Sequence, residues 1–507
     1  MTQTPHSYEP PFVLAIDVGS SSVRASLFDA RAQPVEGADA RAVHVLHTAP
    51  DGTAEDSAEH LLERVSEVID QALRAAGPLA REIKAVGIDT LAGTLLGVDE
   101  AGSPVTPIYT YADTRPGPEV EHLRQHLDVA AAYRRTGCPQ HTSYAPARFL
   151  WLRRAHPDVA RRVRRWMDAG TFLYTKWFGR ADIPMSYSIA SWLGLLNRHK
   201  MRWDEGLLGY LEVSPDQLPW LADYTDAQRG LASSFAQRWP PLRDVPFFLA
   251  VGDGAAANVG SGCLGPGRVA LTIGTSGAMR VLLSEKAPAV PPGLWAYRLG
   301  RAQTLLGGSF NEGGNVLVWA SDTLRLPSLD SVDEALSLLP ADGHGLTVLP
   351  FLAGERSPGW ATDSTAVIIG LQTLTTPLQV LQAFLEAVSY RFGMVWELLA
   401  PFVQENPQII ASGGAITRST YWLQLMADVL QRPVMVADDD EATSRGTAIL
   451  ALHGLGIWPS LDAIPARLGT AYQPDPRRSP VYQAALQRHL QLYDILVGRI
   501  QPTKDGG

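Results

Sequence analysis

The stretch LAIDVGSSSVRASLF, residues 14–28, decides the fold of this chain. An apolar run ends at Asp17 and Gly19, passes through three serines and resumes as a second apolar run. Two apolar runs joined by so short a connection are antiparallel neighbours in a sheet. A tight turn uses glycine and serine for its geometry alone, whereas a phosphate site uses their backbone N–H groups and hydroxyls. The rest of the sequence has to distinguish these two interpretations.

Length and composition limit the class of protein. A chain of 507 residues exceeds what one core usually organises, so we expect two large domains with a ligand cleft between them. Hydrophobic residues make up 46% and charged residues 19%, as in globular proteins. The sequence has no apolar run of the roughly 20 residues that span a bilayer, and residues 1–11 do not resemble a secretory signal. We therefore expect a cytoplasmic protein with no membrane partner, and the net charge of −9 argues against nucleic acid.

The first 120 residues alternate between strand and helix patterns. We expect strands at residues 12–16, 23–29 and 43–47 in an antiparallel meander, then a helix at 57–77 and a buried strand at 83–90. Residues 121–240 are more helical and read as an insertion in the first domain. A second series of strands begins near residue 247.

A candidate internal repeat links the two series of strands. The segments AIDVGSSSVRASLF (15–28) and LTIGTSGAMRVLL (271–283) share one plan of apolar strand, glycine, hydroxyl residues and second apolar strand. Either hairpin alone could be an ordinary Gly-Ser-Thr turn. Together they predict a duplicated domain in which each half contributes a loop to a common cleft.

The two turns have the chemistry of phosphate-binding loops. Glycine lets the backbone approach a phosphate, and successive N–H groups with nearby hydroxyls form a concave anion site. The residues with this chemistry are Gly19, Ser20, Ser21 and Ser22 in the first turn and Gly274, Thr275, Ser276 and Gly277 in the second. A phosphate repels the carboxylate of Asp17 unless a cation lies between them, which suggests Mg²⁺. The alternative is an aspartate that only hydrogen-bonds to its own turn.

Two further segments are candidates for the site. Asp253, in FLAVGDGAAANVGSG (248–262), follows an apolar strand and begins a segment of small residues. It could cap a helix, or act as a general base toward a substrate hydroxyl that attacks a phosphoryl group, and the residues alone leave both open. Gly413 and Gly414 lie between an expected strand at 409–411 and a helix, where a nucleotide base or ribose can lie against backbone. An ordinary strand-to-helix turn explains them equally well.

Taken in order, these motifs resemble those of the FGGY carbohydrate kinases, which belong to the actin and hexokinase superfamily, and are most similar to the gluconokinase branch. The likeness runs from about residue 12 to 455. The opening pattern D-x-G-[TS]-x-S-x-[RK] is met by Asp17, Gly19, Ser20, Ser22 and Arg24. The segments that follow in family order are YTYADTRP (109–116), GDGAAANVGSG (252–262), TIGTSG (272–277), GGSFNEGGNVLVW (307–319), FLAGERSPGW (351–360) and ASGGAITRS (411–419).

The resemblance implies an α/β fold of two RNase-H-like domains flanking a cleft. Residues 1–248 would hold most of the sugar and residues 249–507 most of the ATP. Asp253 would be the catalytic base and touch the substrate, and Asp17 would lie near Mg²⁺. The remaining implied contacts are Gly19, Ser20, Ser21, Ser22, Arg24, Gly274, Thr275, Ser276, Gly277, Gly413, Gly414 and Thr417 for ATP, and Asp113 and Arg115 for the sugar or its carboxylate.

One departure from the family concerns the substrate wall. Where many relatives have Met-His, this chain has Ala92 and Gly93, which removes an imidazole from the wall, and Asp89, Thr90 or Thr94 are candidates to replace it. We expect phosphorylation of a sugar acid, gluconate to 6-phosphogluconate. The alternatives are a kinase for a ketopentose or polyol such as xylulose, ribulose or glycerol, and a non-catalytic nucleotide-dependent regulator, which an intact Asp253 disfavours. The sequence does not decide the oligomeric state, and a homodimer stays open.

Overall fold

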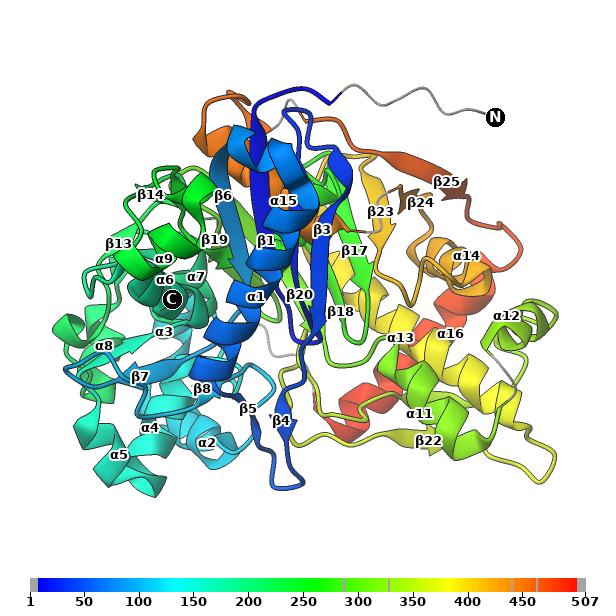
Figure 1. Ribbon diagram of the computed structural model, residues 1–507. Helices are drawn as coiled ribbons and strands as arrows, with labels where there is room; N and C mark the ends of the chain where they lie inside the picture. Colours follow the sequence, from blue (N-terminus) through cyan, green and yellow to red (C-terminus); the bar gives the residue numbers. More distant parts are fainter. Residues whose placement is uncertain (1–7, 285–287, 327–328, 439–440, 462–463, 499–507) are drawn as a thin grey trace.

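The computed structural model describes residues 8–284, 288–326, 329–438, 441–461 and 464–498, which form two sheets of seven strands each (Figure 1). The first sheet has the order β14-β15-β6-β1-β2-β3, and β16 also pairs with β6. Its strands are β1 (Phe12–Val18), β2 (Ser22–Phe28), β3 (Pro34–Val43), β6 (Ile83–Thr90), β14 (Ala227–Gln228), β15 (Phe247–Phe248) and β16 (Val251–Gly252). The second sheet has the order β19-β20-β18-β17-β23-β24-β25. Its strands are β17 (Arg268–Ile273), β18 (Gly277–Leu283), β19 (Trp295–Arg298), β20 (Thr304–Phe310), β23 (Gln408–Ser412), β24 (Val434–Ala437) and β25 (Leu468–Tyr472).

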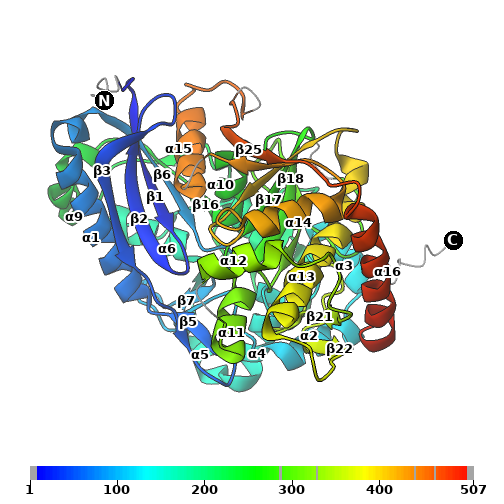
Figure 2. The same cartoon turned by 90° about the vertical axis from the view of Figure 1, so that its right-hand side faces the viewer.

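The first hairpin forms as the sequence predicts. β1 and β2 are antiparallel, Val18 pairs with Val23, and the turn between them spans residues 19–21. β1 is buried along its whole length because helices cover both faces of the sheet. Helix α1 (Ala58–Ala76) packs on β2 and β3, and α15 (Ala442–Gly454) packs on β1 and β6 from the other side (Figure 2).

The predicted strand at residues 43–47 is wrong. The third strand of the meander, β3, ends at Val43, and only the short β4 (His47–Thr48) falls in the predicted range. β3 is an edge strand, so only one row of its side chains is buried, and that row consists of Val35, Ala38 and Ala40 between exposed residues. Alternating alanines give a weak hydrophobic pattern, whereas the exposed Val43 and Val45 give a stronger false one.

The second sheet repeats the plan of the first, which confirms the predicted duplication. β17 and β18 form an antiparallel hairpin in which Ile273 pairs with Gly277, and β20 continues the meander beside β18. In each sheet the first strand of the hairpin also has a parallel neighbour, β6 beside β1 and β23 beside β17. The two sheets therefore have equivalent edges at which phosphate-binding turns can face each other.

Two helices lie between the sheets and touch at glycines. α10 (Asp253–Gly260) and α15 pack together in the space between the sheets (Figure 2). A Cβ atom at Gly446 would lie 1.8 Å from the carbonyl oxygen of Ala256, and one at Gly260 would lie 1.6 Å from that of Ala442. Only glycine permits so close an approach of two helix backbones.

Two hydrophobic cores accompany the sheets. One is built from residues between Phe12 and Ala250, the other from residues between Val269 and Leu486, and a third cluster fills the seam between them. The helical insertion consists of α2 (Gly117–His126), α3 (Val129–Thr136), α4 (Ala145–Ala155), α5 (Pro157–Arg162), α6 (Ala169–Phe178), α7 (Tyr187–Trp192), α8 (Glu205–Leu211) and α9 (Ser233–Arg238). All of these helices except α3 and α5 place side chains in the first core or against it. The second sheet is accompanied by α11 (Asn315–Leu324), α12 (Leu329–Ser337), α13 (Pro377–Leu399), α14 (Thr420–Leu430) and α16 (Ser479–Leu496). Among the described residues, no helix combines the length and apolar character of a membrane span.

Candidate active site

Three aspartates gather at one edge of the first sheet. Asp17 near the end of β1 is in register with Asp89 on the parallel strand β6, and β16, which ends just before Asp253, runs parallel to β6 on its other side. The carboxyl ends of parallel strands meet at the same edge of a sheet, which is where α/β proteins bind their ligands. The strand order therefore brings together three carboxylates that are far apart in the sequence.

Asp253 is the first residue of α10 and faces a cavity of about 250 Å³. Its Oδ1 accepts hydrogen bonds from the backbone N–H of Gly254 (2.8 Å) and of Ala92 (3.3 Å). Burial raises the pKa of Asp253 above its ordinary value of 3.8, while these N–H groups and the Arg280 and Arg356 guanidinium groups oppose the rise. A carboxylate held in place with a raised pKa is suited to accept a proton from a substrate hydroxyl.

Asp17 and Asp89 form a buried carboxyl pair that contacts helix α15. Oδ2 of Asp89 accepts a hydrogen bond from the Thr447 hydroxyl (2.5 Å), and Oδ2 of Asp17 accepts one from the Ser444 hydroxyl (3.5 Å). Burial is the main reason why the pKa of Asp17 rises to about 6 and that of Asp89 rises well above 3.8. The other oxygen of Asp89 is buried without a hydrogen-bond partner. Carboxylates that repel each other in this way, with an unsatisfied oxygen, fit a divalent cation.

The turn between β1 and β2 borders the cavity. The N–H of Gly19 donates to the carbonyl of Ser22 (3.0 Å), which closes the turn, and Ser20 lines the cavity. Ser21 is exposed, whereas Ser22 is buried in β2. Arg24, opposite Asp17 in the hairpin, forms an ion pair with Glu441 just before α15 (3.2 Å). The Arg24 side chain thus links the first sheet to the helix that packs on it.

Three glycine-rich turns meet at the corresponding edge of the second sheet. In the turn between β17 and β18, Gly274 accepts a hydrogen bond from the N–H of Gly314 (2.7 Å), and Thr275 accepts one from Asn315 (3.1 Å). Gly413 has a φ of +93°, and a Cβ atom there would lie 2.5 Å from the carbonyl oxygen of Ile273. The Thr417 N–H and hydroxyl both donate to the carbonyl of Gly413 (3.1 Å each). The expected nucleotide segments 274–277 and 413–417 are therefore in contact, although neither Gly413, Gly414 nor Thr417 lines the cavity beside Asp253.

The cavity beside Asp253 is enclosed by both halves of the chain. Trp192 stacks on Tyr297 with ring centroids 3.9 Å apart, and the hydroxyls of Tyr144 and Tyr297 hydrogen-bond across the cleft (2.6 Å). A Cβ atom at Gly252 would lie 2.6 Å from Nε1 of Trp192, so the glycine before Asp253 lets the indole pack against the strand end. The lining residues are Ser20, Leu91, Ala92, Gly93, Tyr111, Ser143, Tyr144, Trp192, Asp253, Gly254, Thr272, Gly274, Thr275, Ser276, Gly277, Ala278, Arg280, Tyr297, Ser309 and Arg356.

A second cavity of about 600 Å³ adjoins this one and shares Tyr111, Ser143, Thr275 and Ser276 with it. The enclosed site, with one carboxylate beside a hydroxyl-rich turn, has the layout of a phosphoryl-transfer centre.

Comparison with known proteins identifies the family. Residues 12–260 match the N-terminal domain of the FGGY family of carbohydrate kinases, and residues 269–455 match its C-terminal domain. The chain belongs to the FGGY family of carbohydrate kinases. It is therefore an ATP-dependent carbohydrate kinase, and the expected two-domain α/β fold is confirmed.

The relatives of this kinase are named for different substrates. It is 26% identical over 486 residues to the gluconokinase of Bacillus subtilis (strain 168), covering 94% of this chain and 93% of the relative. It is 29% identical over 503 residues to the glycerol kinase of Rhodospirillum rubrum, covering 94% and 98%. Its fold matches the crystal structure of gluconate kinase from Lactobacillus acidophilus (TM-score 0.88, 23% identity, covering 96% and 99%). It matches the ligand-bound xylulose kinase from the same organism with the same values, and glycerol kinase from Plasmodium falciparum with ADP at a TM-score of 0.83 and 18% identity, covering 95% and 98%.

Four sequence-predicted substrate residues of this kinase lie outside the cavity. Asp113 forms an ion pair with Arg115, whose Nη2 also contacts Glu55 (2.7 Å). The Arg115 guanidinium carbon lies 4.7 Å from the ring centroid of Trp151. The charges of Asp113 and Arg115 thus compensate each other locally, and only Tyr111 of that motif reaches the cavity. Asp89 and Thr90 are fully buried and do not line the cavity either.

The residues that do line the cavity include several that the sequence did not single out, above all Arg280, Arg356, Trp192 and Tyr297. Arg280 carries a charge in the middle of the apolar strand β18, and the sequence alone shows this exception to the apolar pattern. Gly313 and Gly314, which meet the 274–277 turn, could also have been found as a glycine pair before a helix.

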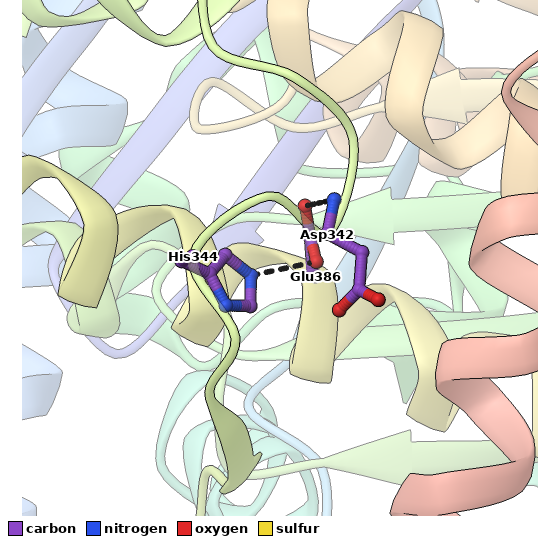
Figure 3. Close-up of side chains that lie close together, drawn as sticks. All are labelled: Asp342, His344 and Glu386. Atoms are coloured by element: carbon purple, nitrogen blue, oxygen red, sulfur yellow. Dashed lines mark hydrogen bonds and ion pairs between the residues drawn. The ribbon is translucent and has the colours of Figure 1, made fainter. Parts of the chain in front are cut away.

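A second group of potential metal ligands, Asp342, His344 and Glu386, lies away from the cavity (Figure 3). Nδ1 of His344 accepts the N–H of Leu346 (2.9 Å), so Nε2 carries the proton toward Glu386 (3.0 Å). The backbone N–H of Asp342 donates to the other oxygen of Glu386 (3.2 Å). The Asp342 carboxylate pairs with Arg488. The protein itself satisfies each ligand atom, so Asp17 remains the better candidate for a cation.

Proposed function

We propose that this kinase transfers the γ-phosphoryl group of ATP to a terminal hydroxyl of a sugar acid, most directly gluconate, to give 6-phosphogluconate. The observation that carries the proposal is the cavity lined by both halves of the chain, in which Asp253 lies with the 274–277 turn and two arginine side chains. The reaction type follows from the family, and the charge of the wall favours an anionic acceptor over a neutral one.

Asp253 would act as the general base. Its carboxylate takes the proton of the acceptor hydroxyl while that oxygen attacks the γ-phosphorus, and the bond from phosphorus to the β-phosphate oxygen breaks to release ADP. The N–H groups of Ala92 and Gly254 fix the orientation of the carboxylate. Because burial raises its pKa, it is a stronger base than an exposed aspartate.

Two turns would hold the phosphates. The turn at residues 19–22 brings Ser20 to the cavity from the first sheet, and the turn at residues 274–277 lines it from the second. Arg24, at the first turn's hairpin, pairs with Glu441. Gly413, Gly414 and Thr417 would lie along the nucleoside. Asp17 would hold Mg²⁺, a fit that the acidic pair and the unpaired oxygen of Asp89 support. The cation would neutralise charge on the transferred phosphoryl group.

A ketopentose or polyol is the second candidate substrate. Ala92 and Gly93 line the cavity, so the absence of an imidazole there changes the surface that meets the acceptor. Glycerol and xylulose kinases also stand among the relatives of this chain. Hydroxyls of the wall, among them those of Tyr111 and Ser143, could serve a neutral sugar as well as a sugar acid.

An ADP-release assay with gluconate, xylulose, ribulose and glycerol tests the substrate. We expect the highest kcat/KM with gluconate, by at least about 10-fold, because hydrogen bonds from cationic donors to a carboxylate are worth more than those to a hydroxyl. A higher kcat/KM with a neutral sugar would refute the gluconate assignment and move it to that substrate class.

A further inference from the structure

We propose that Arg280 and Arg356 together bind the carboxylate of the acceptor and so determine the specificity of this kinase for sugar acids, an inference that rests on the substrate proposed for it. Both side chains line the cavity that contains Asp253. Both belong to the second half of the chain, in which the resemblance placed most of the ATP.

Arg280 lies on β18, three residues after Gly277. Its one hydrogen bond within the described chain goes from Nη1 to the Thr272 hydroxyl, at 3.3 Å, and its Nε is buried without a partner. Nη2 lies near Gly254, the residue after Asp253, since a Cβ atom there would be 3.5 Å from it. Burial lowers the pKa of Arg280 to about 10, so the guanidinium is charged at neutral pH.

Arg356 comes from the loop that follows β21 (Thr347–Leu349). Its guanidinium carbon lies 5.6 Å from the ring centroid of Tyr111, which lines the opposite wall of the cavity, and its Nε is buried without a hydrogen-bond partner. The Asp253 carboxylate raises the pKa of Arg280 and the Arg356 guanidinium lowers it, so the two cations repel each other and Asp253 supplies one negative charge against their two positive charges. An anion between them would relieve the repulsion.

Arg148 and Arg391, which are buried while Arg280 and Arg356 are half-buried, have acceptors of their own. Arg148 donates to the carbonyl groups of Gly93, Thr110 and Ser143, and Arg391 pairs with Glu355. Neither Arg280 nor Arg356 forms an ion pair with any described residue. Arg280 donates only to the Thr272 hydroxyl and Arg356 has no side-chain hydrogen bond to a described residue, so most of their N–H donors at this cavity lack a protein acceptor that a ligand could supply.

The chemistry of the pair fits a carboxylate. A guanidinium presents planar, parallel N–H donors that match the two oxygens of a carboxylate. Asp253 is not the carboxylate that this pair binds, because its Oδ1 already accepts two backbone N–H groups and its carboxylate has to receive the substrate proton. The transferred phosphate offers similar acceptor chemistry, and the test has to separate these two anions.

The test compares the binding of gluconate with that of glucitol, which has the same six-carbon chain with a hydroxymethyl group in place of the carboxylate. Isothermal titration calorimetry at pH 8 without nucleotide is carried out on the wild type, Arg280→Met, Arg356→Met and Arg202→Met. Arg202 is an exposed arginine far from the cavity walls and serves as the matched control. We expect each cavity variant to bind gluconate about 10- to 100-fold more weakly and glucitol nearly unchanged, while Arg202→Met behaves as the wild type.

Arg280→Lys and Arg356→Lys keep the charge but lose the paired donors, so their affinity for gluconate should lie between those of the wild type and the methionine variants. A cooperative thermal unfolding transition of each variant without ligand reports that the protein is folded, and the binding of ADP and of inorganic phosphate is then measured separately. Unchanged gluconate affinity together with weakened ADP or inorganic phosphate binding would assign the arginines to the phosphate and overturn the inference.

The outcomes separate this inference from the proposed function. If the wild type phosphorylates gluconate but the variants bind it normally, only the carboxylate assignment fails. If the wild type does not bind gluconate but binds another aldonate or a uronate in a way that depends on both arginines, only the gluconate assignment fails. If it binds neutral sugars alone, both fail.

Discussion

Replacing Asp17 by asparagine should make the ligand-free protein more stable at neutral pH. Asp17 has a pKa of about 6 in the fold and an ordinary value of 3.8, so folding favours its protonated form. The stability that this preference contributes is present below pH 3.8 and is lost as the pH rises toward 6. Above pH 6 the ionised carboxylate destabilises the fold by roughly 3 kcal/mol, at about 1.4 kcal/mol for each pKa unit. Asparagine has nearly the same size and never ionises, so it removes this penalty.

Differential scanning fluorimetry of the wild type and Asp17→Asn between pH 4 and 8 measures the effect. We expect equal melting temperatures near pH 4 and a melting temperature of the variant that is higher by several degrees at pH 7.5. Sugar phosphorylation by the variant should be strongly reduced, because the proposed Mg²⁺ ligand is lost. The control Asp113→Asn should have the opposite effect on stability, since it removes one of the two carboxylate partners of Arg115. A variant that melts at or below the wild-type temperature at pH 7.5 would refute this account of the acidic pair.

Further predictions concern the base and the helix contact. Asp253→Asn should lower kcat by at least about 100-fold while ADP binding persists, and an ADP-release assay that finds near wild-type turnover would contradict its role as the base. The kcat/KM of the wild type should fall as the pH is lowered, with a midpoint above 3.8, because burial raises the pKa of Asp253; a rate profile that is flat down to pH 4 would count against this. Gly446→Ala should destabilise the fold by about 1–3 kcal/mol or more, because the added methyl group would lie 1.8 Å from the carbonyl oxygen of Ala256. Gly209→Ala, where nothing lies within 4 Å, should leave the melting temperature equal or higher, and the two variants melting alike would disprove the argument from close contact.

The sequence predicted the parts of the fold that depend on local pattern. The two hairpins, the helix at 58–76 and the helix that begins at Asp253 follow from apolar spacing and turn residues close together in the chain. The packing of α15 on the first sheet could not be predicted in this way, because it joins residues more than 300 positions apart and has no short-range signature.

The same distinction between local pattern and long-range contact explains which site residues could be predicted from the sequence and which could not. Asp17 is the penultimate residue of β1, Ser20 and Asp253 follow strand ends, and all three could be found from the sequence alone. Arg115 was misleading because a motif reveals residue type but not the partner, and its carboxylate partner Asp113 is only two residues away. Arg280 was overlooked because a strand pattern is judged by its apolar residues, although one charge in a buried strand deserves an explanation.

Helix α15 has a consequence for how the protein is made. The face of β1 and β6 that α15 covers belongs to the first part of the chain, while the helix itself ends at Gly454. When a ribosome has synthesised the first 250 residues, α15 does not yet exist and that apolar face is uncovered. The nascent first half must therefore wait for most of the second half before its burial is complete, and in the meantime it presents a surface suited to chaperones.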